Sequence, residues 1–534
     1  MKVALCQINT TVGDFDNNKR KILEYISNCK NKDIDIIIFP ELAICGYPPL
    51  DLIWEDGFIN QNIETLEKIA AYTTIPIIIG FIRKDNDKIY NSAAICYEGK
   101  VKHFCDKILL PTYDVFDEDR YFNSGKIPKV FSIPIQKKKI KIGLQICEDL
   151  WDDNYPCKVS EVQKDLNAEL IINISASPYH KSRFKKRKDQ ILKQIQKIDL
   201  PFLYCNMVGA QDELIFDGQS MAFSNIGNLL AFGKSFEEDL VIVNLKKSTI
   251  INRPTENREQ NIFKALCLGI KDYFIKTGHE KAVIGLSGGI DSALVATLAT
   301  EALGKENVYG VSLPSKYSSQ HSLDDAKQLA INLDIDYRVI KIQDSVDALE
   351  LVLAPSYTNS IPNVAEENIQ SRVRGVLLMA LANKFGWLLL STGNKTELAL
   401  GYCTLYGDMN GGLSVISDLN KIEVYALANW VNSRSKEIIP KNSIKKLPSA
   451  ELSYNQVDPF DYSIISPLVD DIIENKKSIT SLIKSGFNEE LVYTMYNRIK
   501  TNEYKRRQAP PGLRVSKKAF GSGRRFPIIN RYKG

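Results

Sequence analysis

Histidine is scarce in this sequence: 534 residues include only His103, His180, His279 and His321, which are far apart. The ten cysteines form no CxxC pair. Zinc sites and disulfide frameworks need such clusters, and papain-like sites need a catalytic histidine, so these classes of site are disfavoured. Scattered cysteines fit a reducing compartment, and we expect a cytoplasmic protein.

Long apolar runs and a strong net charge are also missing. The longest apolar runs, residues 34–39 and 375–391, are short or interrupted by Asn and Lys, whereas a membrane span needs roughly 20 apolar residues. The N-terminus lacks the charged and apolar regions of a signal peptide. A net charge of +5 on this length does not indicate a polyanionic partner. We expect a soluble protein that binds neither membrane nor nucleic acid.

What is present is ordinary globular composition, with 44% hydrophobic and 25% charged residues, in a chain long enough for two large domains. Residues 1–245 read as many short β-rich runs with helices between some of them, several apolar throughout, as in strands buried on both faces. Residues 93–104 and 221–233 read as hairpins with glycine turns. This pattern predicts a mixed sheet covered by helices.

Residues 246–260 are polar and predict a connector. Residues 261–534 then alternate regularly, starting with a helix that Gly278 ends. Four apolar runs predict the strands of a parallel sheet, namely residues 282–287, 308–313, 336–342 and 387–392. The second domain is therefore expected to be α/β.

The segment LSGGIDSA, Leu286 to Ala293, joins one of these strands to a helix. Its glycines allow a tight turn whose N–H groups point at an anion beside a helix N-terminus, which predicts a phosphate site. It is neither a Walker A loop nor a GxGxxG fingerprint. The pattern SGGxDS resembles the pyrophosphate loop of ATP pyrophosphatases. The alternative is a plain strand-to-helix turn with Asp291 or Ser292 as the N-cap.

Four further segments, residues 313–327, 367–383, 391–408 and 417–430, resemble the synthetase domain of NAD synthetases in order and spacing. The resemblance implies a Rossmann-like parallel sheet, Mg²⁺ as cofactor and ATP as co-substrate. It implies that Asp291 and Glu397 hold the metal and that Asp408 and Lys421 contact deamido-NAD. The implied ATP-binding residues are Ser287, Gly288, Gly289, Asp291, Ser292, Arg372 and Thr392. Taken singly, Arg372, Glu397 and Lys421 also fit solvated surface charges.

The segment LQICEDLW, Leu144 to Trp151, places Cys147 against Glu148 and Asp149. Neighbouring carboxylates disfavour a thiolate, so activation must come from elsewhere. Glu41 and Lys107 also lie at the ends of apolar runs. Together with Cys147 they resemble the catalytic triad of the nitrilase superfamily, as found in the glutaminase domain fused to NAD synthetases. The resemblance implies an αββα sandwich, with Glu41 as base and Lys107 lowering the pKa of Cys147 and stabilising the oxyanion. A buried structural cysteine is the alternative.

Other positions carry the same resemblance. The implied glutamine-binding residues are Tyr113, Glu118, Glu148, Ser177 and Arg183. Arg183 suits the α-carboxylate of the substrate, but its basic surroundings also fit a solvated helix charge. The basic segment 504–532 looks by charge like a nucleic-acid tail, yet it resembles the terminus of the family. The segment after Leu452 departs from the family pattern and leaves its loop contacts open.

The resemblance covers nearly the whole chain and implies a glutamine-dependent NAD synthetase, a ligase that is expected to be homo-oligomeric. Glutamine would be hydrolysed to glutamate and ammonia, and ammonia would amidate adenylated deamido-NAD, giving NAD, AMP and pyrophosphate. Two alternatives stay open. One is another amidotransferase of the ATP pyrophosphatase type that acts on a purine or a tRNA base. The other is a nucleotide sensor without enzymatic activity.

Overall fold

The computed structural model describes residues 1–136, 138–247, 249–252, 257–358, 360–361, 363–434 and 436–532. The chain divides into two units, Met1–Glu256 and Asn257–Gly534, and each is described by itself. Of the predicted connector 246–260, residues 248 and 253–256 lie outside the described residues, and a helix begins at Arg258.

The first unit contains a six-stranded sheet in the order β14-β1-β2-β3-β4-β5. Strands β1, β2 and β3 run parallel, and the others pair antiparallel. The hairpin expected in residues 93–104 is the turn between β4 and β5. The strands are β1 (Lys2–Gln7), β2 (Ile36–Ile38), β3 (Ile77–Asp85), β4 (Lys88–Tyr97), β5 (Lys100–Asp106) and β14 (Asp239–Asn244).

A second six-stranded sheet has the order β13-β12-β9-β8-β7-β6. Strands β7, β8 and β9 run parallel, and β12 with β13 forms the second expected hairpin. The strands are β6 (Val130–Ile135), β7 (Lys138–Ile146), β8 (Leu170–Ser175), β9 (Phe202–Asn206), β12 (Met221–Phe223) and β13 (Leu229–Phe232), and a separate ribbon pairs β10 (Val208–Gln211) with β11 (Leu214–Asp217).

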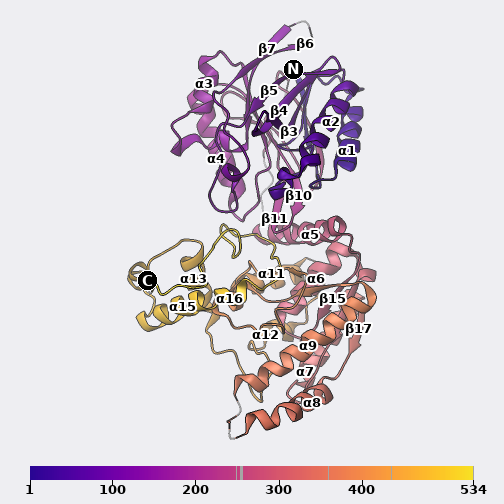
Figure 1. The fold of residues 1–534 in the computed structure, drawn as a ribbon, viewed down its shortest axis with the longest axis vertical. Helices are drawn as coiled ribbons and strands as arrows, with labels where there is room; N and C mark the ends of the chain where they lie inside the picture. The colour runs from indigo at the N-terminus through magenta and orange to yellow at the C-terminus, as the bar shows by residue number, and fades with distance from the viewer. Residues whose placement is uncertain are drawn as a thin grey trace. The chain divides into compact units, whose positions relative to one another are not determined.

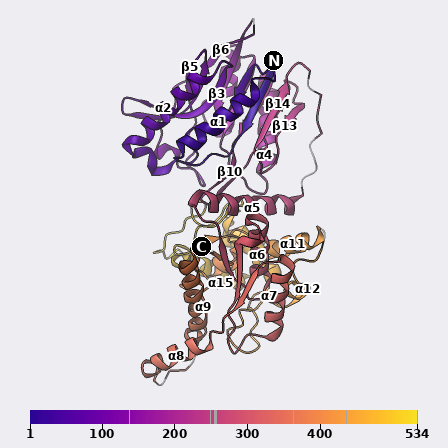
Figure 2. The same cartoon turned by 90° about the vertical axis from the view of Figure 1, so that its right-hand side faces the viewer.

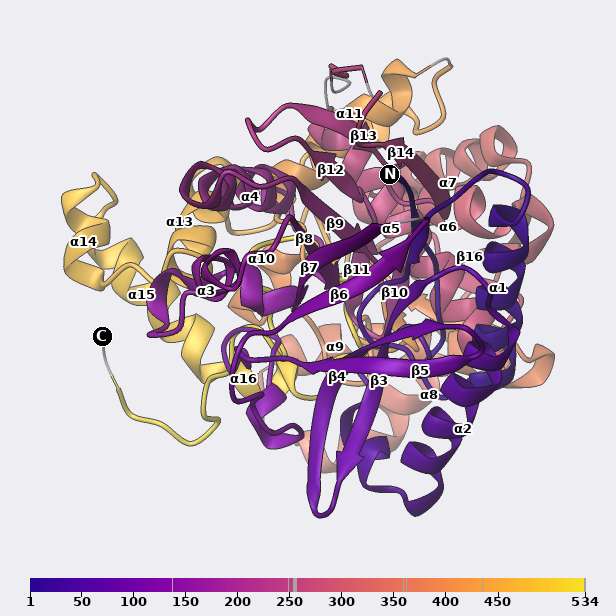
Figure 3. The ribbon, with the colours of Figure 1, turned by 90° about the horizontal axis from the view of Figure 1, so that it is seen from above.

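These sheets stack face to face over an apolar core that includes Leu5, Ile38, Leu144 and Ile172. Helices α1 (Phe15–Cys29) and α2 (Asp56–Tyr72) cover the outer face of the first sheet, and α3 (Val159–Asp165) and α4 (Arg183–Ile198) cover the second. Figure 3 shows α3 and α4 on one side of the strands and α1 and α2 on the other. The expected αββα sandwich is confirmed.

The second unit contains a parallel sheet in the order β17-β16-β15-β18-β19. In Figure 2, α9 lies on one side of these strands and α7 on the other. This confirms the expected α/β architecture. The strands are β15 (Ala282–Gly285), β16 (Val308–Ser312), β17 (Asp336–Val339), β18 (Leu388–Ser391) and β19 (Leu413–Ser414).

Helices make up most of the remainder of this unit, and Figure 1 shows those nearest the C-terminus in yellow. Helix α5 ends at Gly278, as expected, with φ of 75°. None of the described helices combines the length and apolar character that a bilayer crossing requires. The helices are α5 (Arg258–Thr277), α6 (Ile290–Leu303), α7 (Gln320–Leu333), α8 (Gln343–Leu353), α9 (Val364–Phe385), α10 (Lys395–Leu400), α11 (Lys421–Ser433), α12 (Lys441–Lys445), α13 (Tyr462–Ile473), α14 (Ile479–Lys484), α15 (Glu489–Thr501) and α16 (Glu503–Arg506).

Candidate active sites

Cys147 is the first residue after β7 and begins a short 3₁₀ turn, Cys147–Leu150. Its φ of 43° lies in the left-handed region, which is costly for a residue with a side chain and is found at functional turns. The thiol is buried, with 3% of the residue exposed. The strand end therefore presents the sulfur on a constrained backbone.

Lys107 follows β5 and is completely buried. Its Nζ donates to Glu41 Oε1 at 2.7 Å and to Glu118 Oε1 at 2.8 Å. Burial alone would lower the pKa of Lys107, but Glu118 and Glu41 outweigh that effect and raise it well above its ordinary value. Lys107 is thus a permanent cation held between two carboxylates.

Glu41 follows β2 and is fixed through both of its carboxylate oxygens. Oε1 accepts from Asn91 Nδ2 at 2.8 Å as well as from Lys107, and Oε2 accepts from the backbone N–H of Ala176 at 2.7 Å. The sequence predicted neither Asn91 nor the Tyr47 hydroxyl, which donates to Glu118 Oε1 at 3.0 Å. No local motif marks them, because their partners are distant in the chain.

The pKa of Cys147 is raised well above its ordinary value, first by burial and then by the charge of Glu41. Lys107 lowers it, as expected, but Glu118 and Glu148 raise it further. The expected effect of Lys107 on the pKa is thus present, but burial and the surrounding carboxylates outweigh it. The thiol carries its proton at rest, so a base must remove that proton during attack on a substrate.

The two acids beside Cys147, Glu148 and Asp149, have different hydrogen-bond partners. Asp149 is buried, and its carboxylate accepts from the backbone N–H groups of Ile108 at 3.0 Å, Leu109 at 2.9 Å and Ile146 at 3.0 Å. It therefore ties the end of β7 to the segment that follows Lys107. Asp149 has a structural role that its position next to the cysteine did not reveal.

Glu148 is held by two tyrosine hydroxyls. Its Oε1 accepts from the Tyr113 hydroxyl at 3.0 Å and from the Tyr155 hydroxyl at 3.2 Å. Burial, the largest effect, raises the pKa of Glu148, while Lys107 opposes the shift. The structure thus brings Glu148, Tyr113 and the triad together.

Arg183, the first residue of α4, lies near Glu148. Its Nε donates to Ser177 Oγ at 3.1 Å, and its guanidinium lies 4.4 Å from the ring centroid of Trp151. Its charge also acts on Glu148 and Tyr113. Arg183 is therefore not a freely solvated helix charge, and all five predicted glutamine-binding residues gather around the triad.

In the second unit, the loop from Ser287 to Ser292 leads from β15 into α6. Its hydroxyls bond to each other, with 3.2 Å between Ser287 Oγ and Ser292 Oγ, and Gly289 N donates to Ser287 Oγ at 3.2 Å. Gly288 has φ of 76°, and a Cβ there would lie 2.2 Å from Ser322 O. Only glycine fits that position.

Asp291, Glu397 and Lys421 come together from the first turns of three helices. Lys421 Nζ lies 2.5 Å from Asp291 Oδ2 and 3.5 Å from Glu397 Oε1. Asn394 Nδ2 donates to Asp291 Oδ1 at 3.0 Å. Only 3% of the Lys421 side chain is exposed. Lys421 is therefore not the solvated surface charge that was the alternative.

The carboxylates of Asp291 and Glu397 favour positively charged groups beside them. Burial and the neighbouring Asp291 raise the pKa of Glu397 to about 8. Lys421 is raised in pKa by Asp291 and Glu397 against the effect of burial. Among the described residues, no group of three or more His, Cys, Asp or Glu side chains gathers to hold a metal. Two carboxylates nonetheless suit Mg²⁺, which usually completes its shell with water and substrate phosphates.

Glu397 shares a pocket with another predicted residue, Asp408. A pocket is lined by Ser391, Gly393, Glu397, Leu398, Cys403, Asp408, Met409, Ser414, Ala509 and Pro510. Thr392 lies between two of these lining residues, and Asp408 Oδ1 accepts from Thr404 N at 2.6 Å. Arg372 is exposed and donates through Nε to Leu405 O at 3.3 Å. One pocket thus borders Glu397 and Asp408, and Thr392 is next in sequence to two of its lining residues.

Asn394 and Asn420 were not predicted, although the sequence contains a capping pattern that marks both. Each caps a helix and forms a capping box with a glutamate three residues later, Glu397 or Glu423. The pattern Asn-x-x-Glu predicts such a helix start. It marks the starts of α10 and α11, which carry Glu397 and Lys421.

In the segment after Leu452, Gln456 Oε1 accepts from the backbone N–H of Leu452 at 2.8 Å, and the Tyr462 hydroxyl donates to Asp458 Oδ2 at 2.7 Å. In the basic terminal segment, Arg506 and Arg514 are buried, and Arg506 pairs with Glu503. These charges serve internal contacts.

Comparisons with known proteins identify a family for each unit. Residues 2–254 match the carbon-nitrogen hydrolase family, and residues 262–509 match the NAD synthase family. The glutamine-dependent NAD(+) synthetases of Synechocystis sp. and Thermotoga maritima are 42% and 41% identical, with alignments that cover at least 99% of this chain and 99% of each relative.

A solved glutamine-dependent NAD+ synthetase from Acinetobacter baumannii, in complex with ADP, is 36% identical with a TM-score of 0.79, over 99% of this chain and 98% of that one. The fold and the two sites define a class of enzyme in which a carbon-nitrogen hydrolase unit and a nucleotide-binding ligase unit share one polypeptide. The chain belongs to the glutamine-dependent NAD(+) synthetases.

Proposed function

We propose that this chain converts deamido-NAD to NAD with ATP, using ammonia that it releases from glutamine. The observation that carries the proposal is the buried Lys107 Nζ, which joins Glu41 and Glu118 and whose charge acts on Cys147. A cation fixed next to a thiol and a carboxylate base supports amide hydrolysis through a covalent intermediate.

In the first unit, Glu41 takes the proton of Cys147 as the sulfur attacks the amide carbon of glutamine. The Lys107 ammonium offsets the negative charge that develops on the carbonyl oxygen. Glu41 returns the proton to the departing nitrogen, so ammonia leaves and a thioester remains. Water, deprotonated by Glu41, then releases glutamate and restores the thiol.

The charged side chains around the triad support recognition of both charged groups of glutamine. Arg183, steadied by Ser177 and Trp151, is placed for the α-carboxylate. Glu148, held by Tyr113 and Tyr155, is placed for the α-ammonium group. Arg183 and Glu148 carry opposite charges, so together they can form charge-assisted hydrogen bonds with both charged groups of an amino acid.

In the second unit, Ser287, Gly288, Gly289, Asp291 and Ser292 would hold the phosphates of ATP, with Arg372 and Thr392 beside the nucleotide. Asp408 and Lys421 would contact deamido-NAD. Asp291 and Glu397 would hold Mg²⁺, which when bound offsets the repulsion between the phosphates and the nicotinate carboxylate. That carboxylate attacks the α-phosphorus, pyrophosphate leaves, and ammonia then displaces AMP.

Three features support the expected cytoplasmic location, homo-oligomeric state and small-molecule partners of the enzyme. All ten cysteines are free, which fits the cytoplasm. Exposed apolar side chains on and after α8, including Leu351 at 76%, Val352 at 73% and Ile361 at 84%, support a homo-oligomer. The buried arginines of the terminal segment support partners limited to small molecules. Sedimentation of the purified protein tests the oligomer.

The function is tested by incubating the protein with ATP, Mg²⁺, glutamine and deamido-NAD and identifying the products by mass. We expect NAD, AMP and pyrophosphate in equal amounts, together with glutamate. ADP and phosphate in place of AMP and pyrophosphate would contradict the assignment, and binding of ATP without turnover would favour a sensor. Amidation of a purine nucleotide instead of deamido-NAD would favour another amidotransferase.

A further inference from the structure

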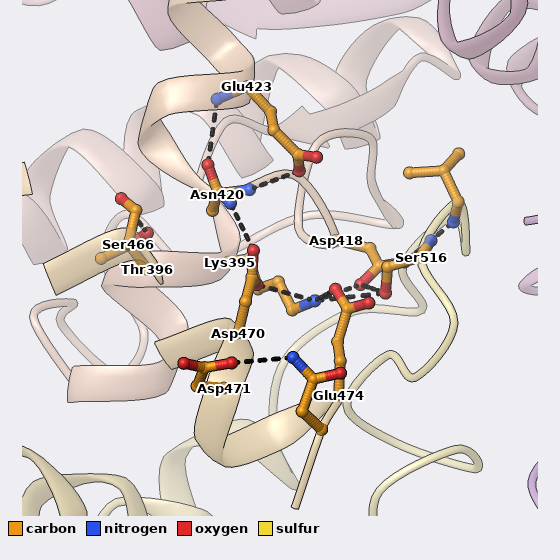
Figure 4. Close-up of polar contacts among 12 residues, drawn as sticks. Lys395, Thr396, Asp418, Asn420, Glu423, Ser466, Asp470, Asp471, Glu474 and Ser516 are labelled. Carbon is orange, nitrogen blue, oxygen red and sulfur yellow. Dashed lines mark hydrogen bonds and ion pairs between the residues drawn. The ribbon is translucent and has the colours of Figure 1, made fainter. Parts of the chain in front are cut away.

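Lys395, the first residue of α10, is a completely buried cation that the proposed mechanism does not use. Its Nζ lies 2.6 Å from Glu474 Oε1 and 3.4 Å from both Asp418 Oδ1 and Asp470 Oδ1, and it donates to Ser516 Oγ at 3.2 Å. Figure 4 shows these side chains converging on the lysine. We call these five residues the Lys395 cluster.

Two partners of Lys395 are themselves tied to other segments. Asp418 Oδ2 accepts from the backbone N–H groups of Val515 at 2.8 Å and Ser516 at 2.6 Å. Asp470 Oδ2 accepts from Asn420 Nδ2 at 2.6 Å. One ammonium thus joins the start of α10, the turn before α11, the end of α13 and the segment at 515–516.

The residues on either side of Lys395 in the chain contact Asp291 and Lys421 directly. Asn394 donates to Asp291, and Thr396 Oγ1 accepts from the backbone N–H of Lys421 at 3.2 Å. Glu397 follows one residue later. A shift of Lys395 therefore moves the groups that orient Asp291, Glu397 and Lys421 together.

The charges in the cluster make it sensitive to loss of the lysine. Three carboxylates face one ammonium, and the environment is largely shielded from water. Burial disfavours the ammonium, but Asp418, Asp470 and Glu474 raise the pKa of Lys395 above its ordinary value. Without that ammonium, the carboxylates would repel each other in a medium of low dielectric constant, and the segments that carry them would separate.

We propose that Lys395 is a positioning residue of the synthetase site, whose ammonium holds α10, α11, α13 and residues 515–516 in the arrangement that lets Asp291 and Glu397 bind a divalent metal. The inference rests on the metal role given to Asp291 and Glu397 above. Groups that orient metal ligands without touching the metal typically change affinity or activity by roughly 10- to 100-fold when they are lost.

The test measures Mn²⁺ binding by electron paramagnetic resonance, in the full-length protein with a non-hydrolysable ATP analogue. Lys395→Met removes the charge and keeps the length of the side chain. Lys276→Met is the matched control, because Lys276 is another largely buried lysine of the second unit, with Nζ 3.2 Å from Asp272 Oδ2. Thermal unfolding establishes that each variant is folded.

We expect folded Lys395→Met to bind Mn²⁺ at least about tenfold more weakly than the parent. We expect Lys276→Met to keep the parent affinity, and Lys395→Arg to restore part of it. Parent-like Mn²⁺ affinity in folded Lys395→Met would show that the cluster only stabilises the fold, and would overturn the proposal.

Should Lys395→Met not fold, Glu474→Gln decides the matter by the same measurement. This change removes the shortest contact of Lys395 but leaves two carboxylates opposite the ammonium, so the fold should persist. Weakened Mn²⁺ binding supports the proposal, and unchanged binding overturns it. Asp291→Asn distinguishes failure of the proposed metal site from failure of the role given to Lys395. If Asp291→Asn leaves Mn²⁺ binding intact, the metal assignment fails and the inference falls with it.

Discussion

At the scale of single residues, Cys147 separates the two halves of the proposed reaction. We expect Cys147→Ala to abolish NAD synthesis from glutamine, by roughly 10⁴-fold or more, because no other group can form the thioester. Synthesis from ammonium salts should stay within about tenfold of the parent, because the second unit keeps its residues. Both nitrogen sources are assayed on one preparation.

Cys157→Ala is the matched control, since Cys157 is a partly buried cysteine of the same unit that lies outside the triad. It should keep activity with either nitrogen source. Glutamine-dependent synthesis by Cys147→Ala would show that this cysteine is structural.

Glu118 makes glutamine hydrolysis sensitive to pH. Burial, only partly offset by Lys107, raises its pKa to about 7. The carboxyl is therefore protonated below about pH 7 and charged above it, and on protonation Lys107 loses one of its two anionic partners. We expect the rate of ammonia release from glutamine to fall as the pH is lowered through this value.

A pH profile of Glu118→Gln checks this expectation, because the variant lacks the titrating group. The decrease near pH 7 should disappear, whereas Asp119→Asn, a change at the exposed neighbour in the same 3₁₀ turn, should keep it. The same decrease in Glu118→Gln would assign it to another residue.

The sequence pointed to Glu41 and Cys147 because each follows an apolar run that forms a strand, and a resemblance connected them with Lys107, which follows β5. The neighbouring carboxylates indicated that the pKa of Cys147 is raised, but the largest cause, burial, depends on packing between two sheets that the sequence does not show. Asn91 and Tyr47 were also beyond its reach, since they meet Glu41 and Glu118 only after folding brings together residues 50 and 71 positions apart.

At the scale of elements, the loop between β15 and α6 depends on Gly288. Gly288→Ala adds a Cβ that collides with the backbone of α7 at Ser322, so the loop must shift. We expect ammonium-dependent NAD synthesis to fall by roughly 100-fold, because a displacement of about 1 Å at a phosphate site has this effect. Glutamine hydrolysis should persist.

Gly278→Ala is the control for backbone strain, because Gly278 has a similar φ of 75° with no atom within 4 Å of the added Cβ. It should cost about 1–2 kcal/mol of stability, measured by denaturant unfolding, and keep synthesis. Equal loss of synthesis in both variants would mean that the collision with Ser322 is unimportant.

The sequence was most informative about elements with strong local signals. The α5 stop at Gly278 and the two hairpins were predicted, because glycine turns and caps are local in origin. β19 was missed because it has two residues, Leu413 and Ser414, too few for any hydrophobic period. It is a strand only because β18 lies beside it.

At the scale of the whole molecule, Asp291 and Glu397 provide the change that complements Cys147→Ala. We expect Asp291→Ala or Glu397→Ala to abolish NAD synthesis with glutamine and with ammonium alike, because both routes need the metal that these carboxylates would hold. Release of glutamate from glutamine should continue. Products are followed by mass in parallel assays.

Asp334→Asn, an exposed change in the same unit, should leave both activities unchanged. Near-parent synthesis by either alanine variant would remove that carboxylate from the metal site. The division into two chemistries was predictable because each half carries its own motifs. The Lys395 cluster was not, since its members come from four separate segments.

The contact between Lys395 and Ser516 spans 121 positions of the chain, and this affects the order in which the activities arise on the ribosome. The first unit is continuous in sequence, so it can fold and acquire its triad while the rest is still being translated. The Lys395 cluster cannot close until Ser516 has emerged. We therefore expect nascent or prematurely terminated chains to hydrolyse glutamine before, or without, any means of using the ammonia.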